Sequence, residues 1–389
     1  MRILNIIHSV NPVHGGPAEG LRQLIGANAG LGHRHEVVTL DAPGASWLAD
    51  FPAPLHPVGP AHWNYGYTPR LAPWLRAHAQ AFDAVIVHGL WQYQSFGSWR
   101  VLRRLGVPYY VFFHGMLDPW FKREYPLKHL KKWLYWPWAE YRVLRDARAV
   151  LFTAEEESRL APQSFWLYKA RHVVVGYGMA LNDTALAADA QAFHAAFPDT
   201  RGKRLVLFLG RIHPKKGCDL LIDAFAEVAG RDPSLHLVLA GPDQVGWRSA
   251  LHEQASQRGV AQRITWCGML AGELKWSAYR AAEVFALPSH QENFGIVVAE
   301  ALALGRPVLI SDKVNIWREI VQAEAGFAAT DTVAGTADSL RRWLDLDAAQ
   351  RAAMGSRAVA CYQQNFHMAA AAQRLVDTIS APAAIGAKV

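Results

Sequence analysis

Short apolar segments alternate with longer, more polar segments along the whole chain of 389 residues. Each apolar segment is rich in Val, Ile, Leu and Phe and has the length of a buried strand, and the segments between them suit crossover helices. The alternation predicts parallel strands joined by helices, which is the α/β class. We expect strands at Arg2–Ile7, His35–Leu40, Ala84–His88, Pro108–Phe113, Ala149–Phe152 and His172–Val175, and then at Arg204–Leu209, His236–Ala240, Ile264–Cys267, Val284–Leu287 and Pro307–Ile310.

The strands fall into two groups, and each group suffices for a doubly wound sheet of its own. The stretch from Tyr177 to Thr200 between them has no strand pattern. A chain of this length also exceeds the size that one hydrophobic core usually serves. We therefore predict a first Rossmann-like domain over 1–178, a second over 179–361, and a final helix with its tail over 362–389.

Composition and charge limit the class of protein. Half of the residues are hydrophobic and about a fifth are charged, as in globular proteins, and the net charge of +7 attracts anions. No nucleic-acid-binding module is recognisable, so we expect no nucleic-acid partner. The N-terminus does not read as a secretory signal, no run approaches the roughly 18 apolar residues of a spanning helix, and the three cysteines are widely spaced. We expect a cytoplasmic protein with reduced thiols.

Candidate ligand-binding residues follow the strands, where ligands bind in sheets of this kind. Gly15 and Gly16 follow the first strand, and adjacent glycines either let the backbone approach a ligand or only form a tight turn. His114 follows the strand at Pro108–Phe113. It is either placed to donate to a substrate hydroxyl or carbonyl, or is a satisfied histidine at a strand end.

The second half carries a stronger signal. Arg211 and Lys216 bracket the start of a helix expected near Cys218. Two cations and a helix N-terminus suit a diphosphate, although a solvated basic loop would have the same composition. Gly241 follows the next strand and forms either a phosphate-side turn or a plain one.

The sharpest feature is the segment from Ser289 to Leu302. Glu292 lies in a short loop, a helix is expected from about Phe294–Gly295, and Glu300 lies in its second turn. The amides of a first helical turn can hold phosphate or sugar oxygens, and each carboxylate can accept two hydroxyl hydrogens. Taken alone, Glu300 would be an ordinary exposed helix glutamate and Glu292 a partner of the helix dipole. Beside the basic loop, the two carboxylates indicate a site for a sugar and a ribose.

With these motifs the chain resembles the family 4 retaining glycosyltransferases of the GT-B fold, from the first strand to the last helix. The likeness rests on His-Gly-Gly-Pro at 14–17, Gly-Arg-Ile-His-Pro-Lys-Lys-Gly at 210–217, Gly-Pro-Asp at 241–243 and the two glutamates Glu292 and Glu300. The resemblance implies two Rossmann-like domains that face each other across a cleft. It also implies a GDP- or UDP-linked sugar as the donor.

The resemblance also implies a role for each site residue. Glu292 would bind hydroxyls of the donor sugar, Glu300 the ribose, and Arg211 and Lys216 the diphosphate. The amides of Asn293, Phe294 and Gly295 would contact the sugar or the phosphates. His114 would lie by the donor sugar, Gly15 and Gly16 would close over the phosphates, and the final helix would return to the first domain.

We therefore expect a hexosyltransferase that needs neither a metal nor another cofactor. Asp345 and Asp347 superficially resemble a metal-binding pair, but we assign them to the surface. The alternatives are a sugar-nucleotide epimerase or a phosphorylase on the same scaffold, and a nucleotide-sugar-binding protein without catalysis. A dinucleotide-dependent oxidoreductase lacks its glycine fingerprint.

The segment 120–136 bears on the acceptor, because it mixes lysines with large aromatic residues, as interfacial helices do. Two interpretations stay open: a membrane face, or a surface helix with its aromatic residues packed inward. A membrane face would place the protein at the inner side of the membrane. The acceptor would then be a lipid-linked glycan in cell-surface polysaccharide or lipopolysaccharide assembly.

Overall fold

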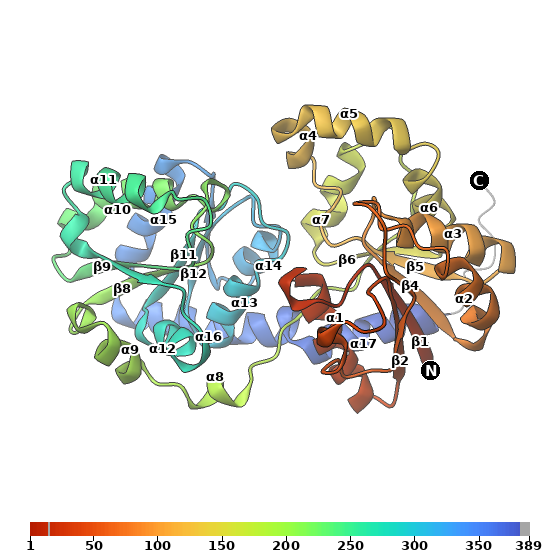
Figure 1. Cartoon of the computed structure of the whole chain (residues 1–389). Coiled ribbons are helices and arrows are strands. Elements are labelled where there is room, and N and C mark those ends of the chain that lie inside the picture. Colours follow the sequence, from red (N-terminus) through yellow and green to blue (C-terminus); the bar gives the residue numbers. More distant parts are fainter. Residues whose placement is uncertain (15, 382–389) are drawn as a thin grey trace. The chain divides into compact units, whose positions relative to one another are not determined.

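The computed structural model describes residues 1–14 and 16–381, and the chain forms two compact units (Figure 1). The first unit runs from Met1 to Gly178 and includes the chain from Met368 onward, whereas the second unit runs from Met179 to His367. In each unit helices flank a sheet of parallel strands. The prediction of two doubly wound α/β domains is confirmed.

The first unit has a seven-stranded sheet in the order β3-β2-β1-β4-β5-β6-β7. Successive side chains of a strand point to opposite faces, and on β4 Val85 and Val87 join one apolar cluster whereas Ala84 and Ile86 join another. Both faces are therefore covered. The elements are β1 (Arg2–Ile7), α1 (Gly16–Gly30), β2 (Arg34–Thr39), β3 (Leu55–Pro57), α2 (Leu71–His78), β4 (Ala84–His88), α3 (Tyr93–Leu105), β5 (Tyr109–Phe112), α4 (Trp120–Glu124), α5 (Pro126–Tyr135), α6 (Glu140–Asp146), β6 (Ala149–Phe152), α7 (Glu155–Leu160), β7 (His172–Val174) and α17 (Met368–Ser380).

The end of the chain differs from the single helix expected over 362–380. Tyr362–Phe366 forms a π-helical turn that stays with the second unit, because the Tyr362 hydroxyl donates to the Met179 carbonyl at 2.9 Å. The chain then extends through His367, and α17 packs against α1 in the first unit. The last residues of the expected tail, 382–389, lie outside the described residues.

The second unit has a six-stranded sheet in the order β10-β9-β8-β11-β12-β13. The strand order reverses beside β8, and such a switch point opens a crevice at the carboxyl ends of the strands. The elements are α8 (Asp183–Ala187), α9 (Ala190–Ala196), β8 (Arg204–Leu209), α10 (Cys218–Val228), β9 (Leu235–Ala240), α11 (Arg248–Gln257), β10 (Ile264–Gly268), α12 (Gly272–Ala281), β11 (Val284–Leu287), α13 (Ile296–Ala303), β12 (Val308–Ser311), α14 (Trp317–Gln322), β13 (Gly326–Ala329), α15 (Val333–Leu344) and α16 (Ala348–Cys361).

Two strands, β3 and β13, were not expected from the hydrophobic pattern. Both are short and lie at the edge of their sheet, where a strand needs only one neighbour. β3 contains Pro57, and β13 begins with a glycine whose missing side chain would lie 2.0 Å from the carbonyl oxygen of Val308. Proline and glycine lower the strand signal, so tertiary pairing decided these two elements.

Candidate active site

The loops that follow β8 and β9 run side by side, and the β8 loop borders the switch point between β8 and β11. Gly241 has φ +149°, and a side chain there would lie 1.7 Å from the carbonyl oxygen of Gly210. Only glycine fits this position. Asp243 accepts hydrogen bonds from the amides of Val245, Trp247 and Arg248, which lowers its pKa. The segment 241–243 is therefore a close turn that leads into α11.

The basic loop after β8 is fastened to the end of β11. Gly217 has φ +69° and passes so close to Pro288 that a side chain would lie 2.2 Å from the Pro288 carbonyl oxygen. The carbonyl of Lys215 accepts from the Ser289 hydroxyl at 3.0 Å and from the His290 amide at 2.8 Å. These contacts fix the position of Lys216.

Lys216 and Glu292 form an ion pair between the two loops. The Nζ atom of Lys216 contacts Oε2 of Glu292, and the side chains are 13% and 21% exposed. The Glu292 backbone is held from the other side, because its amide donates to Lys313 at 2.9 Å and its carbonyl accepts from Asn315 at 3.0 Å. The structure therefore brings these two predicted site residues together.

Helix α13 begins immediately after this pair. Gly295 precedes its first residue with φ +73°, and the Cγ atom of Glu292 would lie 3.2 Å from a side chain at that position. The Phe294 ring is buried and packs edge-on against Phe366, so only its backbone is available to a ligand. Asn293 accepts a hydrogen bond from the Asn315 amide at 3.3 Å. A carboxylate thus stands beside a helix N-terminus that favours anions.

Glu300 is buried rather than exposed on the helix surface. It is 4% exposed, and its two oxygens contact Lys275 Nζ at 2.5 Å and the Tyr279 hydroxyl at 2.9 Å. Sequence reasoning missed Lys275 and Tyr279. Their spacing places them on one face of α12, but nothing in the sequence pairs them with a glutamate more than 20 positions away.

The basic loop concentrates positive charge. The pKa of His213 is lowered by burial and by the charges of Arg211, Lys215 and Lys216. Arg211 is exposed and directs one guanidinium nitrogen to the Gln244 amide oxygen at 3.4 Å, so it lies on the same loop as Lys216 without joining its ion pair. The loop presents cations to an approaching anion.

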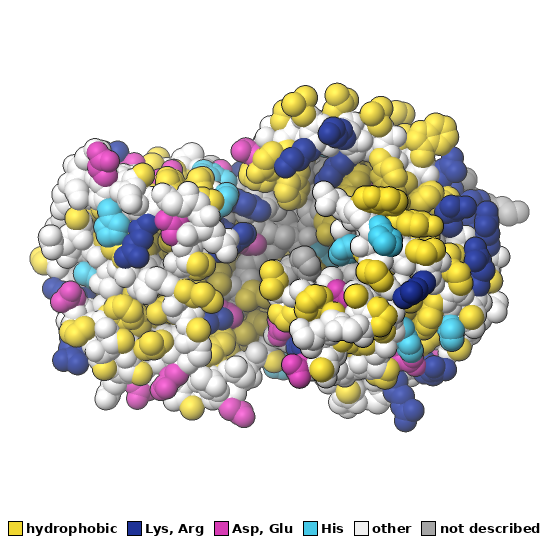
Figure 2. Space-filling model, in the orientation of Figure 1, with side chains coloured by type: hydrophobic (Ala, Val, Ile, Leu, Met, Phe, Trp, Pro, Cys, Tyr) yellow, Lys and Arg dark blue, Asp and Glu magenta, His cyan; other side chains and the backbone are white. Residues whose placement is uncertain are grey.

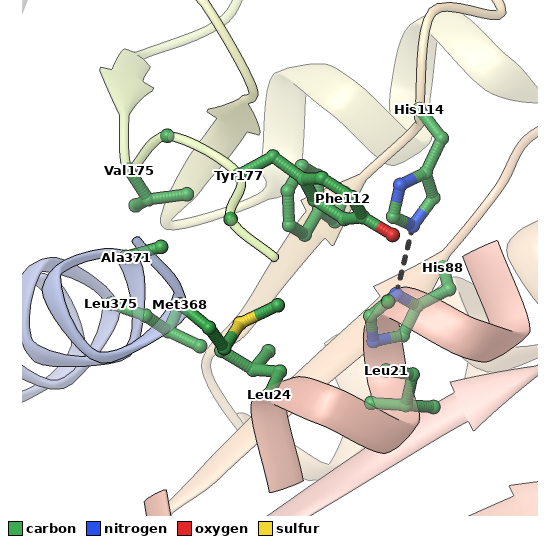
Figure 3. A pocket seen from close by; sticks show the side chains of 13 residues that line it. Leu21, Leu24, His88, Phe112, His114, Val175, Tyr177, Met368, Ala371 and Leu375 are labelled. Atoms are coloured by element: carbon green, nitrogen blue, oxygen red, sulfur yellow. Dashed lines mark hydrogen bonds between the residues drawn. The ribbon is translucent and has the colours of Figure 1, made fainter. Parts of the chain in front are cut away.

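His114, at the end of β5 in the first unit, belongs to a buried hydrogen-bonded chain. Its Nε2 lies 3.0 Å from Nδ1 of His88 (Figure 3). The Nε2 atom of His88 lies 3.2 Å from the Asn5 amide oxygen. The Asn5 amide nitrogen in turn lies 2.9 Å from Nδ1 of His35. Burial lowers the pKa of His114 and of His35 to about 4 and that of His88 well below its usual value. All three rings are therefore neutral at pH 7.

Each contact of this chain needs one donor and one acceptor. The contact between Nε2 of His114 and Nδ1 of His88 can run in either direction, because it depends on the tautomers of the two rings. Nδ1 of His114 takes no part in this chain and is the ring atom that remains for a ligand.

The glycine loop of the first unit is held by Tyr177. Gly15 lies outside the described residues, and Gly16 is the first residue of α1. The Tyr177 hydroxyl donates to the Gly16 carbonyl at 2.8 Å, and its ring lies edge-on to His114 (Figure 3). A side chain at Gly20 would lie 1.4 Å from the Tyr177 oxygen, so the glycine makes room for this contact.

Solved structures share the fold over nearly the whole chain. The sucrose-phosphate synthase of Thermosynechococcus elongatus superimposes with a TM-score of 0.71 at 19% identity, covering 97% of this chain and 98% of that one. Alr3699/HepE of Anabaena, crystallised with UDP, has a TM-score of 0.76 at 20% identity and covers 98% and 100%. At these identities the likeness shows the fold alone.

Sequence comparisons identify relatives of this chain among characterised enzymes. The D-inositol 3-phosphate glycosyltransferase of Nocardia farcinica is 32% identical over 249 residues, 62% of this chain and 54% of that protein. The mannosylfructose-phosphate synthase of Agrobacterium fabrum is 35% identical over 123 residues, 30% and 27% of the two chains. The chain thus matches at most about half the length of these relatives.

Family models cover most of the sequence. The model of the glycosyl transferase 4-like domain matches residues 15–178, and that of the glycosyl transferases group 1 matches residues 189–359. The two matches fall on the first and the second unit in turn. The chain belongs to the group 1 glycosyl transferases, with the GT-B fold.

Proposed function

We propose that this chain transfers a hexose from a nucleoside diphosphate sugar to a glycan or lipid-linked glycan, with retention of the anomeric configuration. The observation that carries the proposal is the pair of Lys216 and Glu292 at the switch point, beside the N-terminus of α13. Relatives support the donor class, since HepE was crystallised with UDP-glucose. The donor's base and sugar are left to experiment.

In the proposed function, the ion pair between Lys216 and Glu292 opens when the donor binds. Without a ligand, Lys216 and Glu292 neutralise each other in a half-buried place. A diphosphate offers Lys216 more negative charge than one carboxylate does, and Arg211 and the helix N-terminus add to this attraction. Lys216 then turns to the diphosphate, and Glu292 becomes available to the hydroxyls of the sugar.

The proposed reaction places charge where these cations lie. The bond between the sugar C1 and the diphosphate oxygen breaks, and its electron pair stays on the diphosphate. The acceptor oxygen bonds to C1 from the same face, and its proton passes to the departing phosphate oxygen. Lys216, Arg211 and the α13 N-terminus stabilise the developing charge. In this proposal neutral His114 forms a hydrogen bond with a hydroxyl through Nδ1.

Glu300 has a defined place in the same proposal. Its carboxylate is oriented by Lys275 and Tyr279, which leaves lone pairs for the hydroxyl groups of a ribose. No metal ion is needed in this scheme. Asp345 and Asp347 have other partners, because Asp345 pairs with Arg231 at 2.5 Å and Asp347 caps helix α16.

A second observation concerns the acceptor. On α5, Leu127, Leu130 and Leu134 are 79%, 60% and 75% exposed, at helical spacing, and Lys128 and Lys131 flank them. Trp133 of the same helix and Trp136, which follows the helix, pack inward. Aromatic residues of this segment thus pack against the first unit, whereas its leucines and lysines face outward. Figure 2 shows hydrophobic and basic side chains gathered along α4 and α5.

This α5 surface (Leu127, Lys128, Leu130, Lys131 and Leu134) suits the headgroup region of an anionic membrane. Among residues 1–14 and 16–381, no helix is long and apolar enough to cross a bilayer. We propose that the protein docks on the membrane through this surface and acts on a lipid-linked glycan. Cell-surface polysaccharide or lipopolysaccharide assembly is the matching process.

The proposed function is tested by thermal unfolding with a panel of GDP- and UDP-linked sugars. A ligand that binds the folded state raises the unfolding midpoint, so one donor class should stabilise the wild type. Replacing Lys216 with alanine should remove most of that shift. The proposal fails if no nucleotide sugar shifts the midpoint. Turnover that requires inorganic phosphate would indicate the phosphorylase alternative, and epimerisation without an acceptor the epimerase.

A further inference from the structure

The first unit has a hollow at the carboxyl ends of β1, β4 and β5. It has a volume of about 220 Å³, and apolar side chains such as Ile7 and Met116 line it together with polar ones, among them His8, Ser9, Gln92, Gln94 and His114. No Lys, Arg, Asp or Glu is among the described residues that line it. A pocket of this composition offers hydrogen bonds without a charge to attract a phosphate or carboxylate.

Two glutamine side chains, Gln92 and Gln94, line the hollow. Gln94 is 1% exposed, and its amide nitrogen donates to the His88 carbonyl at 3.3 Å, so it supports the wall from behind. Gln92 is less buried, and its amide nitrogen donates to the Asn64 carbonyl at 3.4 Å. The Gln92 amide oxygen can therefore accept from a hydroxyl group in the hollow.

A hairpin over residues 61–68 borders the hollow. His62 and Tyr67 exchange backbone hydrogen bonds of 2.8 and 3.0 Å, and Gly66 packs so close that a side chain there would lie 2.6 Å from the His8 ring. The Tyr93 amide donates to the Tyr65 carbonyl at 2.8 Å. The hairpin is thus fastened both to the wall of the hollow and to the start of α3.

The hairpin and the first residue of α3 together form an aromatic platform, made of Trp63, Tyr67 and Tyr93. The rings of Trp63 and Tyr67 stack with centroids 6.3 Å apart, and Tyr93 meets Tyr67 edge-on at 4.9 Å. Trp63 is nevertheless 81% exposed and Tyr67 37% exposed. Rigid aromatic rings that remain exposed beside a pocket are typical of a surface that binds a ligand.

Backbone strain concentrates at the same place. Among the described residues other than glycine, positive φ occurs at Trp63 (58°), Trp91 (72°), His114 (52°) and Glu324 (50°). Trp63 belongs to the platform, Trp91 precedes Gln92, and His114 lines the hollow. Bulky residues adopt such angles at a cost, and they cluster where function requires a fixed geometry.

We infer that the hollow and the platform together form the acceptor site and that it takes an uncharged oligosaccharide. Sugar hydroxyls would pair with Gln92 and His114, and the C–H face of the next sugar ring would lie on Trp63 and Tyr67. The inference rests on the proposed function and specifies its acceptor. It separates this chain from relatives whose name contains the phosphorylated acceptor D-inositol 3-phosphate.

The position of the site also fits a lipid-linked glycan. The Tyr65 hydroxyl of the hairpin lies 2.6 Å from the Tyr135 hydroxyl at the end of α5. The platform is therefore continuous with the helix that carries the α5 surface. An acceptor could keep its lipid at α5 and place its sugars on the platform.

Saturation-transfer NMR tests the site without a donor. The neutral probes are cellobiose, maltose, mannobiose and chitobiose, and the anionic probes are mannose 6-phosphate and myo-inositol 1-phosphate. At about 10 mM, a range suited to weak millimolar binding, at least one neutral disaccharide should bind and the anionic probes should bind more weakly. W63A, Y67A and Q92L should each weaken that binding by about tenfold. W166A is the matched control, because Trp166 is 79% exposed and lies outside the site.

Three results would overturn the inference: no neutral disaccharide binds, an anionic probe binds more tightly, or W63A binds like the wild type. The nucleotide-sugar panel, run on the same variants, keeps this inference apart from the proposed function. Unchanged donor stabilisation in W63A with lost disaccharide binding would support both. Disaccharide binding without donor stabilisation in the wild type would refute the proposed function alone.

Discussion

The Nζ atom of Lys216 contacts the carboxylate of Glu292, although 76 positions separate the two residues along the chain. The contact exists because β8 and β11 are neighbours in the sheet and Gly217 lets one loop pass directly over the end of the other. In the proposed function, the cation at this switch point binds the diphosphate and the carboxylate binds the sugar hydroxyls.

Lys216→Ala and Glu292→Gln should each lower kcat/KM for transfer by about a hundredfold or more, because in the proposed function both groups contact the reacting end of the donor. K203A, the loss of an exposed lysine in the same unit, should leave it unchanged. Steady-state kinetics with the donor found by thermal unfolding checks this, with circular dichroism to verify folding. Full activity in either variant would refute the assigned roles.

Transfer should continue in excess EDTA at close to its untreated rate. Lys216, Arg211 and the α13 N-terminus supply the positive charge in the proposed scheme, so chelation removes nothing that it needs. The measurement is the initial rate after dialysis against EDTA, followed by addition of Mg²⁺ or Mn²⁺. A rate that falls with EDTA and returns with a metal would contradict the scheme.

The first unit should lose stability as the pH falls from about 6.5 toward 4. Burial lowers the pKa of His35 and His114 from 6.5 to about 4, so the unfolded chain takes up protons in this window before the folded chain does. Each ring then contributes up to about 1.4 kcal/mol per pH unit. This contribution is fully present above pH 6.5.

Urea unfolding at several pH values measures this slope. H35Q should show a shallower loss of unfolding free energy with acid, whereas H78Q, which changes an exposed histidine, should follow the wild type. Equal slopes in all three proteins would mean that the buried histidines do not control acid stability.

Replacing Leu127, Leu130 and Leu134 together with serine should abolish binding to vesicles that contain phosphatidylglycerol. Each leucine contributes about 1.5–3 kcal/mol when its side chain leaves water, so the combined loss is large. L186S is the control, because Leu186 is 61% exposed and belongs to the second unit. Co-sedimentation measures the bound fraction. Unchanged binding of the triple variant would exclude this surface as the membrane contact.

Gly20→Ala should destabilise the first unit, since the new methyl group would occupy the place of the Tyr177 hydroxyl. Adding Tyr177→Ala should recover part of the loss, with a coupling of about 1–3 kcal/mol in the double-mutant cycle. G26A lies on the same helix with nothing within 4 Å, and it should be neutral or stabilising. Additive effects of G20A and Y177A would mean that the two residues do not interact.

The fold class followed from local pattern. Runs of Val, Ile, Leu and Phe form the central strands because these strands are buried on both faces, and a buried strand must be apolar along its whole length. Edge strands lack that requirement, so β3 and β13 carried too weak a signal. The sequence pattern also did not predict where the last helix begins. Tyr362 and Phe366 form hydrogen bonds with Met179 instead of continuing a regular helix.

The sequence by itself determined that Glu292 lies in a loop before a helix and Glu300 lies within it, since both facts depend on neighbours along the chain. Only the tertiary structure decided their partners: Lys216 for one, Lys275 and Tyr279 for the other. It likewise decided that His114 ends a buried chain of histidines and that Leu127 faces outward. Residues far apart in the sequence meet because of the order of the strands and the direction of the side chains. Hydrophobic periodicity predicts neither of these.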